Sequence, residues 1–97
     1  MEKIQHGASS TILGMAFDEA SDTLYVRFKQ GTVYSVTANK MHSEIDPMTT
    51  IRDAFIAEGE KLDGSIGKLY NTLIKSQPST YPAVALGPED VPVGIPI

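Results

Sequence analysis

The sequence predicts a single α+β domain: an antiparallel β-meander of three or slightly more strands, packed with one or two α-helices and followed by an extended Pro-rich C-terminal arm. Three observations predict it. Apolar and polar residues alternate within the first forty positions, apolar residues recur at helical spacing between positions 48 and 74, and five of the six prolines fall in the last twenty residues. A chain of 97 residues has room for one core. We therefore expect a flexible lead (1–8), one domain (9–76) and the arm (77–97).

Three segments alternate with period two, the pattern of half-buried strands. They are residues 11–17, 23–29 and 32–37. In the first, Leu13, Met15 and Phe17 are expected on the buried face. The second is the clearest, with Leu24, Val26 and Phe28 on one face and Tyr25, Arg27 and Lys29 on the other. Gly31 supplies the positive φ that a tight turn to the third segment requires.

Two helices are expected after the strands. Asp46 and Pro47 indicate a helix start, with Asp46 as the N-cap and the proline at the first helical position. Apolar residues recur at helical spacing and predict the buried face of this helix: Met48, Ile51, Phe55 and Leu62. Ser65 is expected to cap a second, shorter helix that ends near Lys75. The prolines after residue 77 exclude a helix or a central strand there, which favours an extended arm lying on another surface.

Charge and composition exclude several function classes. The net charge is −4 with no run of basic residues, which disfavours a surface that coats nucleic acid. The absence of cysteine excludes disulfides and thiolate chemistry and fits a cytoplasmic protein. The first residues lack the apolar run of a signal peptide, and no stretch has the length of a membrane helix. We expect no membrane association.

Several short motifs resemble the KTSC domain, a module named for its place at the C-terminus of some lysyl-tRNA synthetases and also found as small stand-alone bacterial and phage proteins. The motifs are Ser9–Ser10–x–Ile12, Ala16–Phe17–Asp18, Leu24–x–Val26–x–Phe28 with Gly31 and Val33–Tyr34, and Ser65–x–Gly67–Lys68–x–Tyr70–Asn71–x–x–Ile74. The resemblance covers about residues 9–75 and implies a strand meander with helices packed against it. The segment between Tyr34 and Ser65 is longer than the family's, and the Pro-rich tail has no family counterpart. The family's activity is poorly defined, with nucleic-acid binding a common suggestion.

The candidate ligand site is an anion corner at the start of the second helix. Ser65, Gly67 and Lys68 would surround the free N–H groups of a helix N-terminus, where an anion is favoured. The spacing fails as a phosphate loop, because the early glycine is missing and Leu69 replaces the Ser/Thr that would hold magnesium. The alternative is that Ser65 is only a cap. Tyr70 and Asn71, just beyond, could stack on a base or bond its edge.

A second set of candidates lies on the strands. Tyr25 and Arg27, with Lys29 beyond them, could stack a base and pair a phosphate, or could simply be a solvated strand face. Ser10 could line a site or only begin a strand with a local turn.

Catalytic and metal chemistry find little support. Neither His6 nor His42 belongs to a Ser-His-acid set. His42 with Glu44 and Asp46 lacks a second histidine or cysteine, so we predict no metal, no cofactor and no enzyme activity. The first hypothesis is a non-enzymatic binder of a small anionic ligand, such as a nucleotide or cyclic nucleotide, as in phage proteins that sequester nucleotide signals. It would act as a homo-oligomer with the C-terminal arm at the interface. The alternatives are a single-stranded RNA or DNA binder, and a structural protein that docks a partner through the arm.

Overall fold

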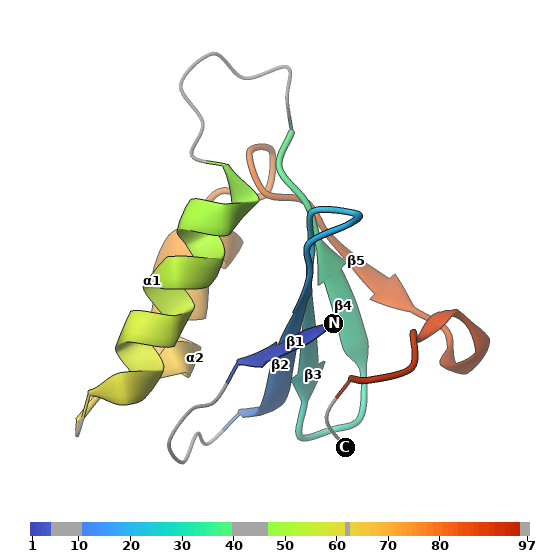
Figure 1. The fold of residues 1–97 in the computed structure, drawn as a ribbon, viewed down its shortest axis with the longest axis horizontal. Coiled ribbons are helices and arrows are strands. Elements are labelled where there is room, and N and C mark those ends of the chain that lie inside the picture. The colour runs from blue at the N-terminus through green and yellow to red at the C-terminus, as the bar shows by residue number, and fades with distance from the viewer. Residues whose placement is uncertain (5–10, 40–46, 62, 96–97) are drawn as a thin grey trace.

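A five-stranded antiparallel sheet with the strand order β1-β2-β3-β4-β5 forms one layer of the molecule (Figure 1). The computed structural model describes residues 1–4, 11–39, 47–61 and 63–95. The strands are β1 (Glu2–Ile4), β2 (Ile12–Asp18), β3 (Thr23–Phe28), β4 (Val33–Val36) and β5 (Ala83–Leu86). The predicted α+β class is confirmed, and the central meander is β2, β3 and β4. The sheet is larger than the minimal expectation by one strand at each edge.

The helices form a second layer on one face of this sheet (Figure 1). They are α1 (Met48–Glu60) and the short α2 (Ile66–Tyr70), which continues without a break into a π-helix, η1 (Asn71–Lys75). Apolar side chains from both layers make one core between them. Its fully buried members include Phe17, Leu24, Val26, Met48, Ile51 and Phe55.

The predicted buried and exposed faces of the strands are confirmed except at the start of β2. The register between β2 and β3 shifts between Ile12 and Gly14, so Leu13 is an extra residue at a bulge. Leu13 is consequently exposed, contrary to prediction, while Ile12 is buried. The turn between β3 and β4 is tight as expected, and Gly31 adopts a φ of 111°.

The start of α1 also differs from the expectation. Pro47 has an extended ψ of 155°, and its carbonyl accepts the first helical hydrogen bonds, so it precedes the helix as the cap residue instead of occupying the first helical position. The predicted cap, Asp46, and the predicted core residue Leu62 lie outside the described residues.

Both chain ends join the sheet. Residues 2–4 of the expected flexible lead form β1, because Ile4 reaches the core and pairs opposite Met15. The expected extended arm is not confirmed: Ala83–Leu86 pair with β4 as an edge strand, a position that flanking prolines permit. A 3₁₀ turn, η2 (Pro88–Asp90), follows, and Ile95 is then buried with Ala16 and Val33 on the other face of the sheet.

Candidate functional site

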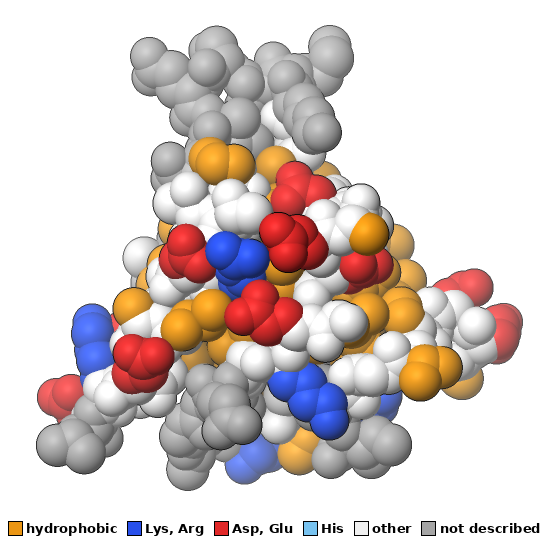
Figure 2. Space-filling view, in the orientation of Figure 1, with side chains coloured by type: hydrophobic (Ala, Val, Ile, Leu, Met, Phe, Trp, Pro, Cys, Tyr) orange, Lys and Arg blue, Asp and Glu red, His pale blue; other side chains and the backbone are white. Residues whose placement is uncertain are grey.

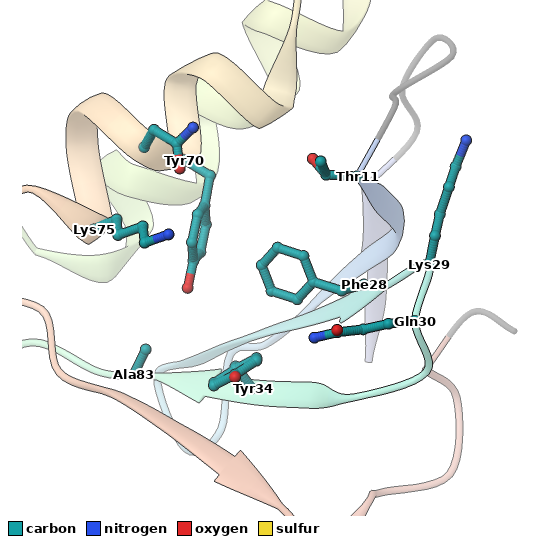
Figure 3. A pocket seen from close by; sticks show the side chains of 9 residues that line it. Thr11, Phe28, Lys29, Gln30, Tyr34, Tyr70, Lys75 and Ala83 are labelled. Atoms are coloured by element: carbon teal, nitrogen blue, oxygen red, sulfur yellow. The ribbon is translucent and has the colours of Figure 1, made fainter.

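A cleft of about 620 Å³ lies where the α2–η1 segment meets the exposed ends of β3 and β4. Its size falls within the usual range for small-molecule sites, roughly 300–1,000 Å³. Nine residues line it: Thr11, Phe28, Lys29, Gln30, Tyr34, Tyr70, Asn71, Lys75 and Ala83. The chain thus brings the β3–β4 hairpin, the helical segment and β5 together around one hollow (Figure 3).

Three aromatic rings form the apolar part of the cleft. Phe28 lies between Tyr34 and Tyr70, with a ring-centroid distance of 5.4 Å to each. Both contacts are edge-to-face, at 87° and 80°, a favourable arrangement for aromatic pairs. Burial raises the pKa of the Tyr70 hydroxyl above its ordinary value, and nearby Tyr34 raises it further. Tyr70 therefore keeps its proton at neutral pH and can donate a hydrogen bond.

The polar groups of the cleft come from both layers. In Figure 3 the Tyr70 ring extends from the helical segment toward the sheet, the Lys75 side chain points toward the Tyr70 ring, and the Gln30 amide points in from the hairpin. Lys29 lies at the rim with its ammonium directed away from the rings. Lys75 is therefore the cation best placed to meet a ligand that lies against the aromatic rings.

The π-helix explains how Tyr70 and Lys75 come to share this cleft. They are five residues apart, and in an α-helix of about 3.6 residues per turn such residues point roughly 140° apart. The wider turn closes i to i+5, as in the 3.1 Å bond from the Ser76 N–H to the Asn71 carbonyl. In this wider turn, residues 70 and 75 point more nearly in the same direction than they would in an α-helix. Apolar periodicity predicts a helix here but does not distinguish the two helix types.

Two donors of the predicted anion corner, the N–H groups of Ser65 and Lys68, are bonded within the protein. The Ser65 hydroxyl accepts a 3.3 Å hydrogen bond from the Lys68 N–H, which confirms the cap. The Ser65 N–H donates to a Glu58 carboxylate oxygen at 2.8 Å. This bond, with the Lys61 ammonium at 3.2 Å, lowers the pKa of Glu58. A carboxylate of the chain thus already accepts the hydrogen bond of one donor at this corner. Ser65, Gly67 and Lys68 line neither the aromatic cleft nor a second cleft that contains Arg27.

The glycine before this corner has a packing role. A Cβ on Gly64 would lie 2.1 Å from the Glu58 backbone oxygen, so only glycine permits the close approach to the end of α1. The glycine-serine pattern that resembles part of a phosphate loop is here a tight connection between two helices.

The strand candidates lie on the opposite face from the aromatic cleft. Tyr25 packs against the small cluster of Ala16, Val33 and Ile95, which explains its half-buried state. Arg27 lies 3.4 Å from the Gly31 carbonyl and lines a second cleft of about 530 Å³ beside Leu86 and Val91. Arg27 and Tyr25 therefore do not join Tyr70 and Asn71 in one site.

Ser10 and the trio of His42, Glu44 and Asp46 lie outside the described residues. In the parts of the chain that are described, no group of three or more His, Asp or Glu side chains is placed to hold a metal ion.

Several cleft residues were missed as site residues by sequence reasoning. Phe28 was assigned only to the core, and Thr11, Gln30, Lys75 and Ala83 were not singled out. The Phe28–Lys29–Gln30 run before Gly31 could have indicated these residues, since it lies at a hairpin tip and such tips often present side chains to a neighbouring element. Which element would face that tip is not encoded locally.

Comparison with protein-family models, with curated proteins and with solved structures finds no match to the chain. Within the described segments, no helix has the length and apolar character required to cross a membrane.

Proposed function

We propose that this protein binds a small anionic ligand with a planar ring, of the nucleotide or cyclic-nucleotide class, in the cleft of Phe28, Tyr34 and Tyr70. The observation that supports this most directly is that Lys75 lines the same cleft as three aromatic rings. Aromatic side chains stack on nucleobases, and an ammonium group pairs with a phosphate. Gln30 and Asn71 add amide groups that can both donate and accept hydrogen bonds with a base edge.

The charge of the cleft lining favours an anion over a cation. Three aromatic rings around a hollow also suit a quaternary ammonium group. However, none of the nine described lining residues is acidic, whereas two are lysines. A cationic ligand would meet like charge without a neutralising carboxylate, so the ligand we propose is negatively charged.

A small ligand fits the surface better than a long nucleic acid strand does. On the face drawn in Figure 2, the described acidic side chains lie across the middle and the basic ones are scattered among and below them. Strand binders require a continuous basic groove that follows the phosphates. The net charge of −4 also opposes one. Single-stranded RNA or DNA is therefore the alternative that the experiment below tests.

The proposal includes a cellular setting. We propose that the protein holds its ligand without turning it over, as a sequestering protein encoded by a phage or bacterium would, in the cytoplasm, where a cysteine-free chain is at no disadvantage. We also propose that it acts as a homo-oligomer with its C-terminal segment at the interface. The resemblance to the KTSC domain stays a prediction from its motifs.

The test is calorimetric titration of the whole chain with AMP, adenosine and inorganic phosphate, and separately with a cyclic dinucleotide and a short single-stranded oligonucleotide. AMP carries both ring and charge, whereas adenosine and phosphate carry one each. We expect AMP to bind most tightly, because stacking and the Lys75 contact act together. Lys75→Ala is expected to weaken AMP binding about tenfold or more, the value of a charge-assisted hydrogen bond. Lys68→Ala is the matched control, since Lys68 is an exposed lysine of the same helical segment and does not line the cleft.

Four results would contradict parts of this proposal. Equal loss in both lysine variants would place AMP elsewhere on the surface. Equal affinity for AMP and phosphate would remove the role of the rings. A short single-stranded oligonucleotide that binds more tightly than AMP, with an affinity that falls steeply with salt, would favour the alternative. No binding of AMP, of a cyclic dinucleotide or of the oligonucleotide would refute the proposed function.

A further inference from the structure

The two edge strands of the sheet differ in how well they are protected. β1 is three residues long and carries Glu2 and Lys3, and charged or very short edges discourage pairing with another chain. β5 has the uncharged sequence Ala83–Val84–Ala85–Leu86 and pairs with β4 in an unbroken register. Val84 is 57% exposed. Figure 2 shows hydrophobic side chains over the side of the molecule where Figure 1 places β4 and β5.

The hydrogen bonds of β5 establish which backbone groups point outward. The Thr37 N–H donates to the Pro82 carbonyl, and the Asn39 N–H donates to the Thr80 carbonyl, both in the β4–β5 register. The N–H and C=O of one strand residue point to the same side, and the side alternates along the strand. The groups of Val84 therefore face β4, as those of Pro82 do. Those of Ala83 and Ala85 face away from the sheet.

This alternation also determines what the prolines do. A proline protects an edge when its missing N–H lies on the outward side. Pro82 and Pro88 have the same parity as Val84, so in the β5 register they lie on the side of β4. Neither removes an outward donor from Ala83 or Ala85. The prolines that flank β5 thus leave its free edge able to accept another strand.

We infer that the β5 edge pairs with β5 of a second copy of this chain, antiparallel and across a twofold axis at Val84. In that register Ala83 of each copy faces Ala85 of the other, so the outward N–H and C=O groups exchange hydrogen bonds. Val84 opposes its own copy in a non-hydrogen-bonded pair, where side chains lie closest. The exposed valine becomes buried by the same contact that satisfies the backbone.

These features favour a second copy of this chain as the partner of the β5 edge. An antiparallel pair of identical strands is self-complementary, so it requires no partner sequence designed to match it. The β5 edge is uncharged and has small alanines, so nothing in it favours a different protein of complementary charge. Assembly stops at two chains, because the remaining edge, β1, is short and charged.

Pairing at β5 also bears on the cleft. Ala83 lines the cleft from the outermost strand, so a second copy of β5 would extend the sheet past Ala83 and give the cleft a wall on that side. This consequence rests on the ligand site of the proposed function, whereas the dimer does not depend on that site. The two hypotheses can therefore fail separately: the dimer by mass measurement without ligand, and the ligand site by titration.

Native mass spectrometry and sedimentation of the full chain without added ligand test the inference. We expect a dimer of twice the 10.5 kDa chain mass that dissociates on dilution. Val84→Lys is expected to raise the dimer dissociation constant about tenfold or more, because it removes a buried valine and opposes two like charges. Val93→Lys is the matched control: Val93 is 98% exposed and lies outside β5, so the dimer should persist. Circular dichroism of both variants checks that the fold is retained.

Hydrogen exchange gives a readout independent of substitution. The amides of Ala83 and Ala85 should exchange slowly at high protein concentration and quickly on dilution, whereas the Val84 amide, bonded to β4, should change little. A monomer at all concentrations, an equal effect of the two lysine substitutions, or fast exchange at Ala83 and Ala85 within a dimer would each overturn the inference.

Discussion

The two ends of the helical segment 66–75 differ in both sequence and structure. The first end has Gly64, Ser65 and Lys68, which match the pattern of an anion site. The second end has Tyr70 and Lys75, a pair that matches no anion-binding pattern. In the folded protein the first end bonds a carboxylate of its own chain at 2.8 Å, whereas the second end opens onto the cleft.

This difference concerns the availability of donors. A free N–H group attracts an anion only while nothing else in the fold accepts its hydrogen bond. Glu58, seven residues before Ser65, already does so. The Lys75 ammonium instead points toward the Tyr70 ring at the cleft (Figure 3). The first end thus stabilises the fold, and the second is where we expect ligand.

The largest expected effect is at the second end. Tyr70 is 6% exposed and packs against Phe28, so Tyr70→Ala should lower the free energy of unfolding by about 3–5 kcal/mol, the usual cost of removing a buried aromatic ring. Urea denaturation measures this. Tyr70→Phe keeps the ring and should retain most of the stability, so a large loss in that variant would show that the hydroxyl matters more than the packing.

Gly64→Ala tests the packing at the first end. The added methyl group would lie 2.1 Å from the Glu58 backbone oxygen, and relieving that clash should cost about 1–3 kcal/mol. Chemical denaturation at neutral pH provides the value. AMP affinity should stay at the wild-type level once the protein is folded. A variant as stable as wild type would contradict the close approach of α1 and residue 64.

Ser65→Ala removes the cap from α2. The loss of the 3.3 Å bond to the Lys68 N–H should lower stability by about 1 kcal/mol. Thermal unfolding followed by circular dichroism measures the change. If Ser65→Ala instead abolished AMP binding without reducing stability, the anion corner would be the ligand site after all, and the contrast between the two ends would be reversed.

The smallest effect is expected from Glu58→Gln, and it should depend on pH. The pKa of Glu58 is lowered in the folded protein, chiefly by the Ser65 N–H and then by Lys61, so the carboxylate stabilises the fold above its unfolded value near 4.5. That contribution is lost as the pH falls through the lowered folded value. Wild type should therefore exceed the variant in stability at pH 7, and the two should converge in acid. Denaturation curves from pH 7 to pH 3 test this, and a gap independent of pH would contradict it.

Much of the fold was predictable from local patterns. Alternation in residues 23–28, with Gly31 at the turn, gives β3, β4 and their faces. The cap at Ser65 and the apolar spacing give α2, and Met48, Ile51 and Phe55 are buried as expected. The edge strands were not predicted, because β1 has only three residues and the proline composition after residue 77 hides the four residues of β5. The exposed position of Leu13 depends on a shift in pairing with β3, which β2 alone does not specify.

The candidate site was predicted only in part. Tyr70 and Asn71 do line the cleft, whereas Arg27 and Tyr25 lie on the far face. Because side chains alternate along a strand, Arg27 and Phe28 point to opposite faces of the sheet. Once the helices are known to cover the Phe28 face, Arg27 is expected to lie away from the aromatic cleft. The contribution of Lys75 to the cleft was not foreseeable, since it depends on a π-helical turn.

The α+β class, the alternating faces of the central strands and the turn at Gly31 follow from residues a few positions apart, and the acidic charge follows from composition. Which donors are already bonded, which lysine lines the aromatic cleft and how well each edge of the sheet is protected became clear only from the folded chain. Those properties depend on groups distant along the chain, such as Phe28 with Tyr70 and Val36 with Ala83, and no local pattern records how such groups meet.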